Sequence, residues 1–394
     1  MNKNLFPNEN DMINAWEYIE SKIFNTKTNM LYDHVIVDEN DWPTPEECER
    51  SWPNPCGWAT NLDDGMINGG TMVEACINRY NITGEKEVAE FAHKLIDGMI
   101  RCAETAKSEG FLPRSVTPVD GKSHYIDSSR DQYTMFLYGA HCYINSVICS
   151  PEEKEALKEI VLKIAKRAEK NAVPETGYDM LREDGGRSIA TIIWGPELKN
   201  HEIGRLPMIY LSAWEFTGDE YWLNRYKEIR DEAYERSLPM TSYWHLYTLQ
   251  QMQNSIRLCY DIDTDIGWKE KYLHLMEVVA DYVNDKIDYV YFKLKVKEDF
   301  NHPYTCFRDI EPFVQKSPSE LVYLNPDPGD TDTFFLMQDA ANVIIVSRTV
   351  PGYKLTEEAL ELFKFAFEKI DLDIHMRAVP IHFLNAYYML KTGD

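Results

Sequence analysis

Hydrophobic positions along this 394-residue chain follow a helical period and alternate between two kinds of helix. Residues 66–80 are apolar on most sides, as expected of a helix that is buried all round. Residues 85–107 carry a one-sided apolar stripe with charges opposite, formed by Val88, Phe91, Leu95, Met99 and Cys102. A tight turn joins the two segments, so the sequence predicts a hairpin of one inner and one outer helix.

The same pairing recurs along the whole chain. Further inner helices are predicted at 130–148, 204–217, 240–261, 332–348 and 376–390, and amphipathic outer helices follow all of them except the last. The segment 12–24 has the apolar stripe of the missing outer partner. Pairing it with 376–390 closes a ring of six hairpins, so we expect residues 1–394 to form one all-α domain, an (α/α)6 barrel.

Three inner segments end in Thr-Gly followed by an acid, at Thr83-Gly84-Glu85, Thr217-Gly218-Asp219 and Thr392-Gly393-Asp394. Glycine ends a helix in the left-handed conformation, and an acid is favourable at the start of the next helix. The connections from outer to inner helices are long, at 25–65, 108–126, 172–203 and 287–331. Long loops usually carry function, so the site is predicted where the inner helices begin. Residues 287–296 alternate like a strand, which predicts a small sheet there.

This ring of hairpins resembles the six-hairpin (α/α)6-barrel glycosidase superfamily over essentially the whole chain. The superfamily includes unsaturated glucuronyl and rhamnogalacturonyl hydrolases and, more distantly, N-acylglucosamine 2-epimerases. The Thr-Gly-acid turns are typical of it, and they specify fold rather than chemistry. The resemblance implies a small carbohydrate substrate bound in a cleft at the loop-rich end, without a cofactor.

Composition narrows the function classes. The net charge is −24, with 41 basic and 65 acidic residues, which argues against nucleic-acid binding and anionic membranes. No C-x-x-C pair suggests structural zinc, and we expect no metal. There is no run of about 18 apolar residues and no apolar signal-peptide core, so a cytoplasmic location is expected. The oligomeric state stays open.

Acidic residues precede the first two inner helices. Asp63 and Asp64 follow Trp58 just before the first, and Asp127, Arg130 and Asp131 open the second. Axes of neighbouring helices lie about 8–10 Å apart, so carboxylates at both starts would face each other at about 6–9 Å, the range for hydrolysis with an intervening water. The alternative is that these acids cap the helices.

The resemblance also implies two aspartates at the barrel mouth, and Asp64 and Asp127 are the pair that fits, with Asp131 in reserve. Other candidates for substrate contact lie in the same loops: Trp58, Asp63, Arg114, His124, Arg130, Tyr133, Arg187, Trp194, Arg205, Tyr243, Trp244, His245, Arg308, Asp332, His375 and Arg377. Arginine binds carboxylates in a bidentate manner, and aromatic rings stack on sugars. Salt bridges and core packing explain each of these residues equally well when it is taken alone.

The leading hypothesis is a glycoside hydrolase that uses carboxylate acid/base catalysis on short oligosaccharides, including uronic-acid-bearing ones. The first alternative is a sugar epimerase or isomerase using His124, His245 or His375, because histidine titrates near neutrality. A uronate lyase with a tyrosine base and a non-catalytic sugar-binding barrel are the remaining alternatives.

Overall fold

The computed structural model describes residues 6–188, 190–238, 240, 245–300, 304–316, 322–326, 331–372 and 377–392. Within these residues the inner helices are α3 (Gly65–Thr83), α5 (Arg130–Ile144), α7 (Arg205–Thr217), α9 (Tyr247–Ile262), α12 (Thr331–Arg348) and α14 (Pro380–Lys391). The outer helices are α1 (Glu9–Tyr18), α4 (Lys86–Glu104), α6 (Pro151–Asn171), α8 (Glu220–Ser237), α10 (Ile266–Asn284) and α13 (Glu357–Phe367). Shorter helical segments are Ile19–Ile23, Glu39–Asp41, α2 (Pro45–Glu49), Pro174–Thr176 and α11 (Ile287–Val296).

The inner helices form a closed ring. Each contacts the next along the chain, and α14 returns to contact α3. The outer helices pack on them from outside, and α1 lies against α14, with Trp16 edge-on to Tyr388 at 5.7 Å. This arrangement confirms the predicted (α/α)6 barrel. Helix α5 also contacts α9 directly, although α7 lies between these two helices in the chain order.

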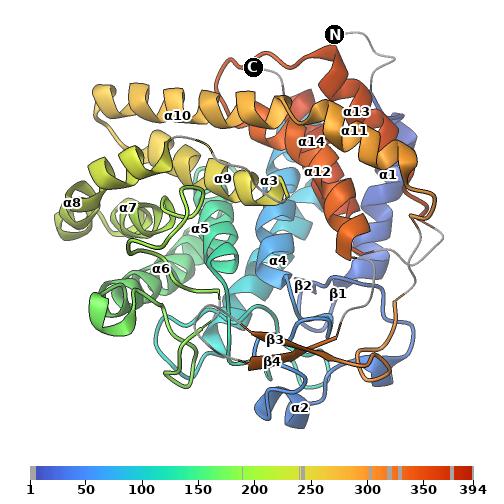
Figure 1. Ribbon diagram of the computed structural model, residues 1–394, viewed down its shortest axis with the longest axis horizontal. Coiled ribbons are helices and arrows are strands. Elements are labelled where there is room, and N and C mark those ends of the chain that lie inside the picture. The colour runs from blue at the N-terminus through green and yellow to red at the C-terminus, as the bar shows by residue number, and fades with distance from the viewer. Residues whose placement is uncertain are drawn as a thin grey trace.

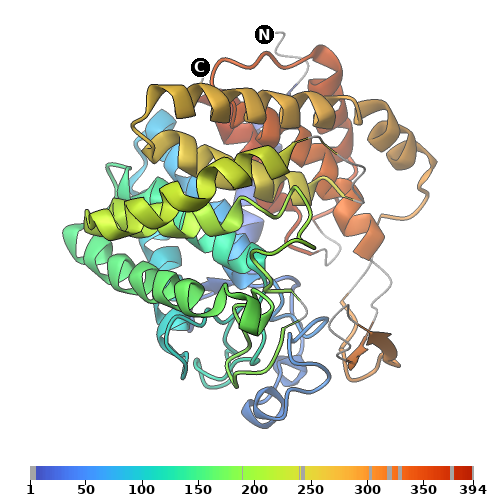
Figure 2. The same cartoon turned by 60° about the vertical axis from the view of Figure 1, so that its left-hand side comes forward.

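Two small antiparallel hairpins lie among the long connections. They are β1 (Phe24–Asn25) with β2 (Met30–Leu31) and β3 (Phe313–Lys316) with β4 (Val322–Asn325). Figures 1 and 2 show both hairpins, α2 and the long loops gathered on one side of the helices. Within the described residues, no helix has the length and apolar character needed to span a membrane.

The glycine turns are as predicted where they are described. Gly84 and Gly218 end α3 and α7 in the left-handed conformation, with φ of 66° and 67°. The third glycine, Gly393, lies outside the described residues. The prediction of a strand at 287–296 is wrong, because this segment forms α11. Its Ile287, Val290 and Leu294 have helical spacing and are buried where α11 contacts α12 and α13. The predicted β element of the 287–331 connection is instead β3–β4.

A close approach of backbones joins α3 to α5. A Cβ added at Gly70 would lie 2.2 Å from the carbonyl oxygen of Met135, and one at Gly139 would lie 2.8 Å from the Cα of Gly70. Gly70→Ala should therefore push the helices apart and lower the free energy of unfolding by about 3 kcal/mol. Gly218→Ala is the control, because it meets no atom within 4 Å and should cost only about 1 kcal/mol of backbone strain. If urea denaturation showed the same loss of unfolding free energy for Gly70→Ala and Gly218→Ala, the close approach of α3 and α5 would not explain the effect.

At the end of the barrel where the inner helices finish, a buried histidine connects three of them. His141 on α5 contacts Glu215 on α7 at 2.7 Å and Asp261 on α9 at 3.5 Å. Burial would lower the pKa of His141, but these carboxylates raise it to about 9. Because the folded pKa exceeds the unfolded value, the contribution to stability is complete below about pH 6.5 and is lost as the pH rises through about 9.

His141→Gln leaves Glu215 without its cation, while Asp261 keeps its ion pair with Arg257, so the substitution should cost on the order of 3 kcal/mol at pH 6. The difference from the native chain should shrink as the pH approaches 10. Urea denaturation of both proteins between pH 6 and pH 10 measures this difference. A difference that does not change with pH would contradict the assignment.

Candidate active site

Asp64 occupies the position where α3 begins, but its side chain does not cap the helix. Its Oδ1 accepts a hydrogen bond from Gln132 Nε2 at 3.0 Å and lies 3.7 Å from Arg114 Nη1. The side chain keeps 34% of its surface exposed, although the residues before and after it in the loop are largely buried. The capping alternative is therefore excluded for Asp64, and its carboxyl group is available to a substrate.

Acceptors from other parts of the chain hold the start of α3. The carbonyl oxygen of Arg114 accepts the N–H of Met66 at 3.2 Å, and Asp33 binds the residues just before the helix. The Oδ2 of Asp33 accepts the backbone N–H groups of Asp63 and Asp64, at 3.0 and 3.2 Å, and its Oδ1 accepts from Asn68 Nδ2 at 3.1 Å. Gly65 lets the start of α3 approach Arg114 and Ser115, because a Cβ there would lie 2.0 Å from Ser115 Oγ and 2.8 Å from the carbonyl oxygen of Arg114. The start of α3 is thus held by residues from distant parts of the chain.

The loop before α3 is strained. Ala59 and Asn61 adopt left-handed backbone conformations, with φ of 65° and 69°. Asn61 exchanges hydrogen bonds with the backbone of His34 at 2.6 and 3.1 Å, and Asp63 Oδ2 accepts the N–H of Ala59 at 2.9 Å. Such strain persists only where the surroundings impose it, and it is concentrated at functional sites.

A cluster of three carboxyl groups sets the electrostatics. Burial and the nearby charge of Asp33 raise the pKa of Asp64 to about 7, although Arg114 and Arg377 oppose the shift. Burial and the charges of Asp33 and Asp64 raise the pKa of Asp63 well above its usual value, although Arg377 opposes the shift. Like charges in one site cannot all ionise, so Asp64 is a carboxyl group that can hold a proton at neutral pH.

Asp131 lies in the first turn of α5 and keeps 28% of its side-chain surface exposed. Its Oδ1 pairs with Nη2 of the buried Arg205 at 3.4 Å, and Arg205 also donates to Thr134 at 2.9 Å. The charge of Asp131 contributes to raising the pKa of Asp64, and the Asp64 partner Gln132 is its neighbour in sequence. Asp64 and Asp131 therefore lie near enough for the charge of one to act on the other.

Aromatic side chains of α9 and α12 lie near these carboxylates, together with histidines of the segments that precede α7 and α9. Tyr247 stacks on Phe335 at 4.9 Å, and both carboxylates, Asp131 and Asp64, raise its pKa further beyond the effect of burial. His245 lies 4.7 Å from Phe335, and its Nδ1 is 3.3 Å from Asp339 Oδ2. Burial and the charges of Arg205 and Arg130 lower the pKa of His201 to about 3.

Three candidates from the second inner helix and its loop do not reach the mouth. Asp127 has no exposed surface and accepts hydrogen bonds from Cys56 Sγ at 3.5 Å and Tyr323 Oη at 3.2 Å. The Tyr133 hydroxyl accepts the N–H of Leu112, and His124 lies 3.2 Å from Glu183 in a buried pair. Protein groups enclose the Asp127 carboxyl, so this geometry does not support the predicted pairing of Asp64 with Asp127. Asp131 is the carboxyl group at the start of α5 that stays partly exposed.

The arginines are engaged with protein groups. Arg130 pairs with Glu202, Arg187 with Asp179, and Arg308 with Glu47. Arg114 donates to the carbonyl oxygen of Asp63 at 3.0 Å, and Arg377 Nε donates to His34 Nε2 at 2.9 Å. Trp194 is covered by Arg236, whose guanidinium lies 5.3 Å from the ring centre.

Some candidates cannot be placed. Tyr243, Trp244 and His375 lie outside the described residues, as does the side chain of Asp332. Among the residues that are described, no three His, Cys, Asp or Glu side chains converge as ligands of a metal ion would.

Four residues of the site are absent from the predicted set: Asp33, Gln132, Tyr247 and Asp339. Gln132 directly follows Asp131 and Tyr247 opens an inner helix, so position alone could have suggested both. Asp33 and Asp339 act on partners about 30 and 94 positions away, and no local pattern reveals such contacts.

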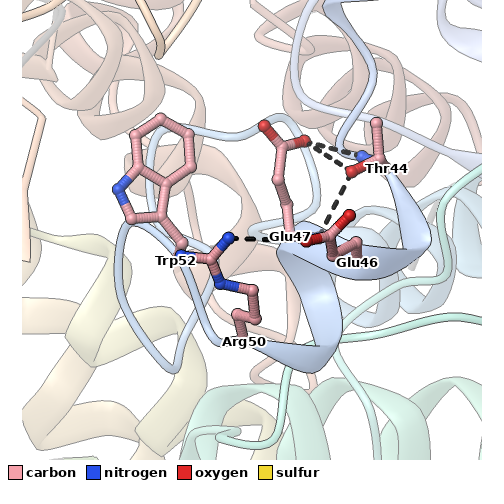
Figure 3. A pocket seen from close by; sticks show the side chains of 5 residues that line it. All are labelled: Thr44, Glu46, Glu47, Arg50 and Trp52. Atoms are coloured by element: carbon pink, nitrogen blue, oxygen red, sulfur yellow. Dashed lines mark hydrogen bonds and ion pairs between the residues drawn. The ribbon is translucent and has the colours of Figure 1, made fainter.

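A surface pocket of about 370 Å³ lies elsewhere, at α2. Figure 3 shows its lining, in which Glu47 is hydrogen-bonded to Thr44 and Arg50 reaches Glu46. Burial would raise the pKa of Glu47, but hydrogen bonds from Arg308 and Thr44 hold it below its usual value. The Glu47 carboxyl is therefore poorly suited to proton donation, and the candidate site remains at Asp64 and Asp131.

The fold resembles known sugar-acting proteins. A sugar epimerase from a ruminal bacterium superposes with a TM-score of 0.53 and 10% identity, over 97% of this chain and 99% of that one. A family 76 glycoside hydrolase (mannosidase) from Bacteroides thetaiotaomicron superposes with a TM-score of 0.45 and 9% identity, over 97% of each chain. No protein-family model and no curated protein matches the sequence. The chain has the six-hairpin (α/α)6-barrel fold.

Proposed function

We propose that this chain is a carbohydrate-active enzyme that hydrolyses glycosidic bonds, with Asp64 as the general acid and Asp131 as the second carboxylate. One observation carries the proposal. Two neighbouring carboxyl groups at the starts of adjacent inner helices are partly exposed, and the environment of Asp64 raises its pKa to about 7. Two carboxyl groups at a sugar site, one of them protonated, are the requirement of glycoside hydrolysis.

The chemistry follows from these positions. Protonated Asp64 donates its proton to the glycosidic oxygen while the bond from that oxygen to the anomeric carbon breaks. Asp131 either removes a proton from the attacking water or attacks the anomeric carbon itself, in which case water releases the sugar in a second step. Arg205 holds the Asp131 carboxylate from its buried side, and Gln132 orients Asp64.

The surrounding groups favour neutral sugars. Each candidate arginine among the described residues is engaged with protein groups, as set out above, so a uronate would have to compete for its cation. Trp58 is half-buried beside Arg114 and offers an apolar ring surface to a sugar. Oligosaccharides of neutral hexoses or pentoses therefore fit the site better than uronic-acid-bearing ones.

A sugar epimerase is the second candidate, and a specific pair supports it. His245 is oriented by Asp339, the arrangement of a general base held by a carboxylate. A base at this place could remove the proton beside the carbonyl of an open-chain sugar, and an acid on the opposite face could return it. The likeness to the ruminal sugar epimerase is a likeness of fold and agrees with either reaction.

Product analysis separates the candidates. The enzyme is incubated in D2O with di- and trisaccharides of glucose, mannose, xylose and uronic acids, and with the free monosaccharides, and the products are followed by NMR. New reducing ends support hydrolysis. Interconversion of free sugars with deuterium uptake beside the carbonyl supports the epimerase, and a new conjugated double bond supports a lyase. A folded enzyme that changes none of these sugars would contradict the proposal.

A further inference from the structure

The buried carboxyl of Asp127 connects the second inner helix to the β3–β4 hairpin. Its Oδ2 accepts a hydrogen bond from the Tyr323 hydroxyl at 3.2 Å, and its Oδ1 accepts the N–H of Ser128 at 2.9 Å. Asp127 has no exposed surface, and Tyr323 is 2% exposed. A hydrogen bond between two buried side chains is costly to break, because it leaves an unpaired polar group behind.

The contact with Asp127 is made by the inward face of the β3–β4 hairpin. Tyr323 points inward, while its neighbour Leu324 is 42% exposed, as the alternation of a strand requires. The carbonyl oxygen of Leu324 accepts a hydrogen bond from Asn54 Nδ2 at 3.2 Å. The hairpin is therefore fixed both to the start of the second inner helix and to the loop that precedes α3.

Trp58 lies against this fixed point. Its ring centre is 6.0 Å from that of Tyr323, and the Arg114 guanidinium is 5.9 Å from the ring. The same Arg114 lies 3.7 Å from the Asp64 carboxylate. Gly57, just before Trp58, has a φ of 70° and no space for a Cβ, which would lie 2.3 Å from Tyr125. The Trp58 ring is thus held from several sides and shares Arg114 with the candidate acid.

We infer that Asp127 and Tyr323 are positioning residues that hold the β3–β4 hairpin against Trp58, so that the Trp58 ring forms a stacking surface for the second sugar of an oligosaccharide. The inference rests on the proposed function. It assigns to the hairpin a preference for longer substrates, because only an oligosaccharide reaches beyond the bond held at Asp64. The Trp58 surface is assigned to the sugar on the non-reducing side of the cleaved residue, so aryl monoglycosides, which have no sugar there, do not use it.

Tyr323→Phe tests this inference, because it removes the hydroxyl and keeps the ring. On gluco-, manno- or xylotriose, whichever is cleaved, KM should rise about 5-fold with kcat nearly unchanged, the loss expected for one buried hydrogen bond. The 4-nitrophenyl monoglycoside of the same sugar should be cleaved as by the native enzyme. Leu324→Thr, on the outward face of the same strand, is the control and should change neither substrate.

Asp127→Ala removes the acceptor of the Tyr323 hydroxyl and should reproduce the effect, and the double variant should lose no more than either single one. Equal losses on trisaccharide and monoglycoside, or additive losses, would overturn the positioning role. Hydrogen exchange gives a readout without any sugar. The amides of β4 should exchange faster in Tyr323→Phe, and unchanged exchange would overturn the inference even if hydrolysis itself is established.

Discussion

Asp64→Asn is expected to lower kcat on oligosaccharides by on the order of 10³-fold, within the range for loss of a general acid. Asp64 is the proton donor of the proposed mechanism because its raised pKa lets it hold a proton at neutral pH, and an amide cannot donate in this way. The size of the loss should depend on the leaving group. The dinitrophenolate of a 2,4-dinitrophenyl glycoside leaves without protonation, so the variant should cleave this substrate at nearly the native rate.

The pH profile gives a second expression of the same prediction. Because Asp64 must be protonated to act, kcat/KM of the native enzyme should fall as the pH rises through about 7. The fall should disappear when Asp64→Asn acts on the dinitrophenyl glycoside. An unchanged rate on oligosaccharides would remove Asp64 from the chemistry.

Unfolding is not expected to explain the loss. The folded-state pKa of Asp64 lies above its unfolded value, so ionisation of Asp64 opposes folding as the pH rises through about 7. Asparagine removes that ionisation, and Asp64→Asn should be at least as stable as the native chain at pH 8. Thermal unfolding of both proteins at pH 5 and pH 8 checks this control.

Asp131→Asn should produce the other large loss, on the order of 10³-fold on both the oligosaccharide and the dinitrophenyl glycoside. Water activation or nucleophilic attack is needed whichever group leaves, so a good leaving group cannot compensate. Steady-state rates on the two substrates measure it. Asp265→Asn, at the exposed start of α10, is the matched control and should retain full activity. If Asp131→Asn cleaved the dinitrophenyl glycoside at nearly the native rate, Asp131 would be the general acid and Asp64 the second carboxylate.

The barrel was predictable because its signals are local and repeated. Gly84 and Gly218 stand at helix ends that only a left-handed residue completes, and the apolar stripes of the outer helices are read directly from spacing. Residues 287–296 misled because Ile287, Val290 and Leu294 satisfy a helical period while the residues between them alternate. Packing against α12 and α13 stabilises the helix over the strand, and the sequence of the segment alone does not reveal these contacts.

The site was predictable only in part. The sequence placed acids at the starts of two adjacent inner helices, and Asp64 lies there with its side chain free of capping. Which acid of the second helix faces the mouth depends on Tyr323 and Cys56, which enclose Asp127 from distant parts of the chain. The raised pKa of Asp64 likewise depends on Asp33, whose contact with the start of α3 has no local signal.

A crystal structure of the Asp64→Asn variant with the trisaccharide that the native enzyme cleaves is the most direct measurement. We expect a glycosidic oxygen within hydrogen-bonding distance of residue 64, Asp131 beside the anomeric carbon, and the next sugar ring over Trp58. A trisaccharide bound in the surface pocket of Thr44 and Trp52, or at His245 with the carboxylates untouched, would contradict it.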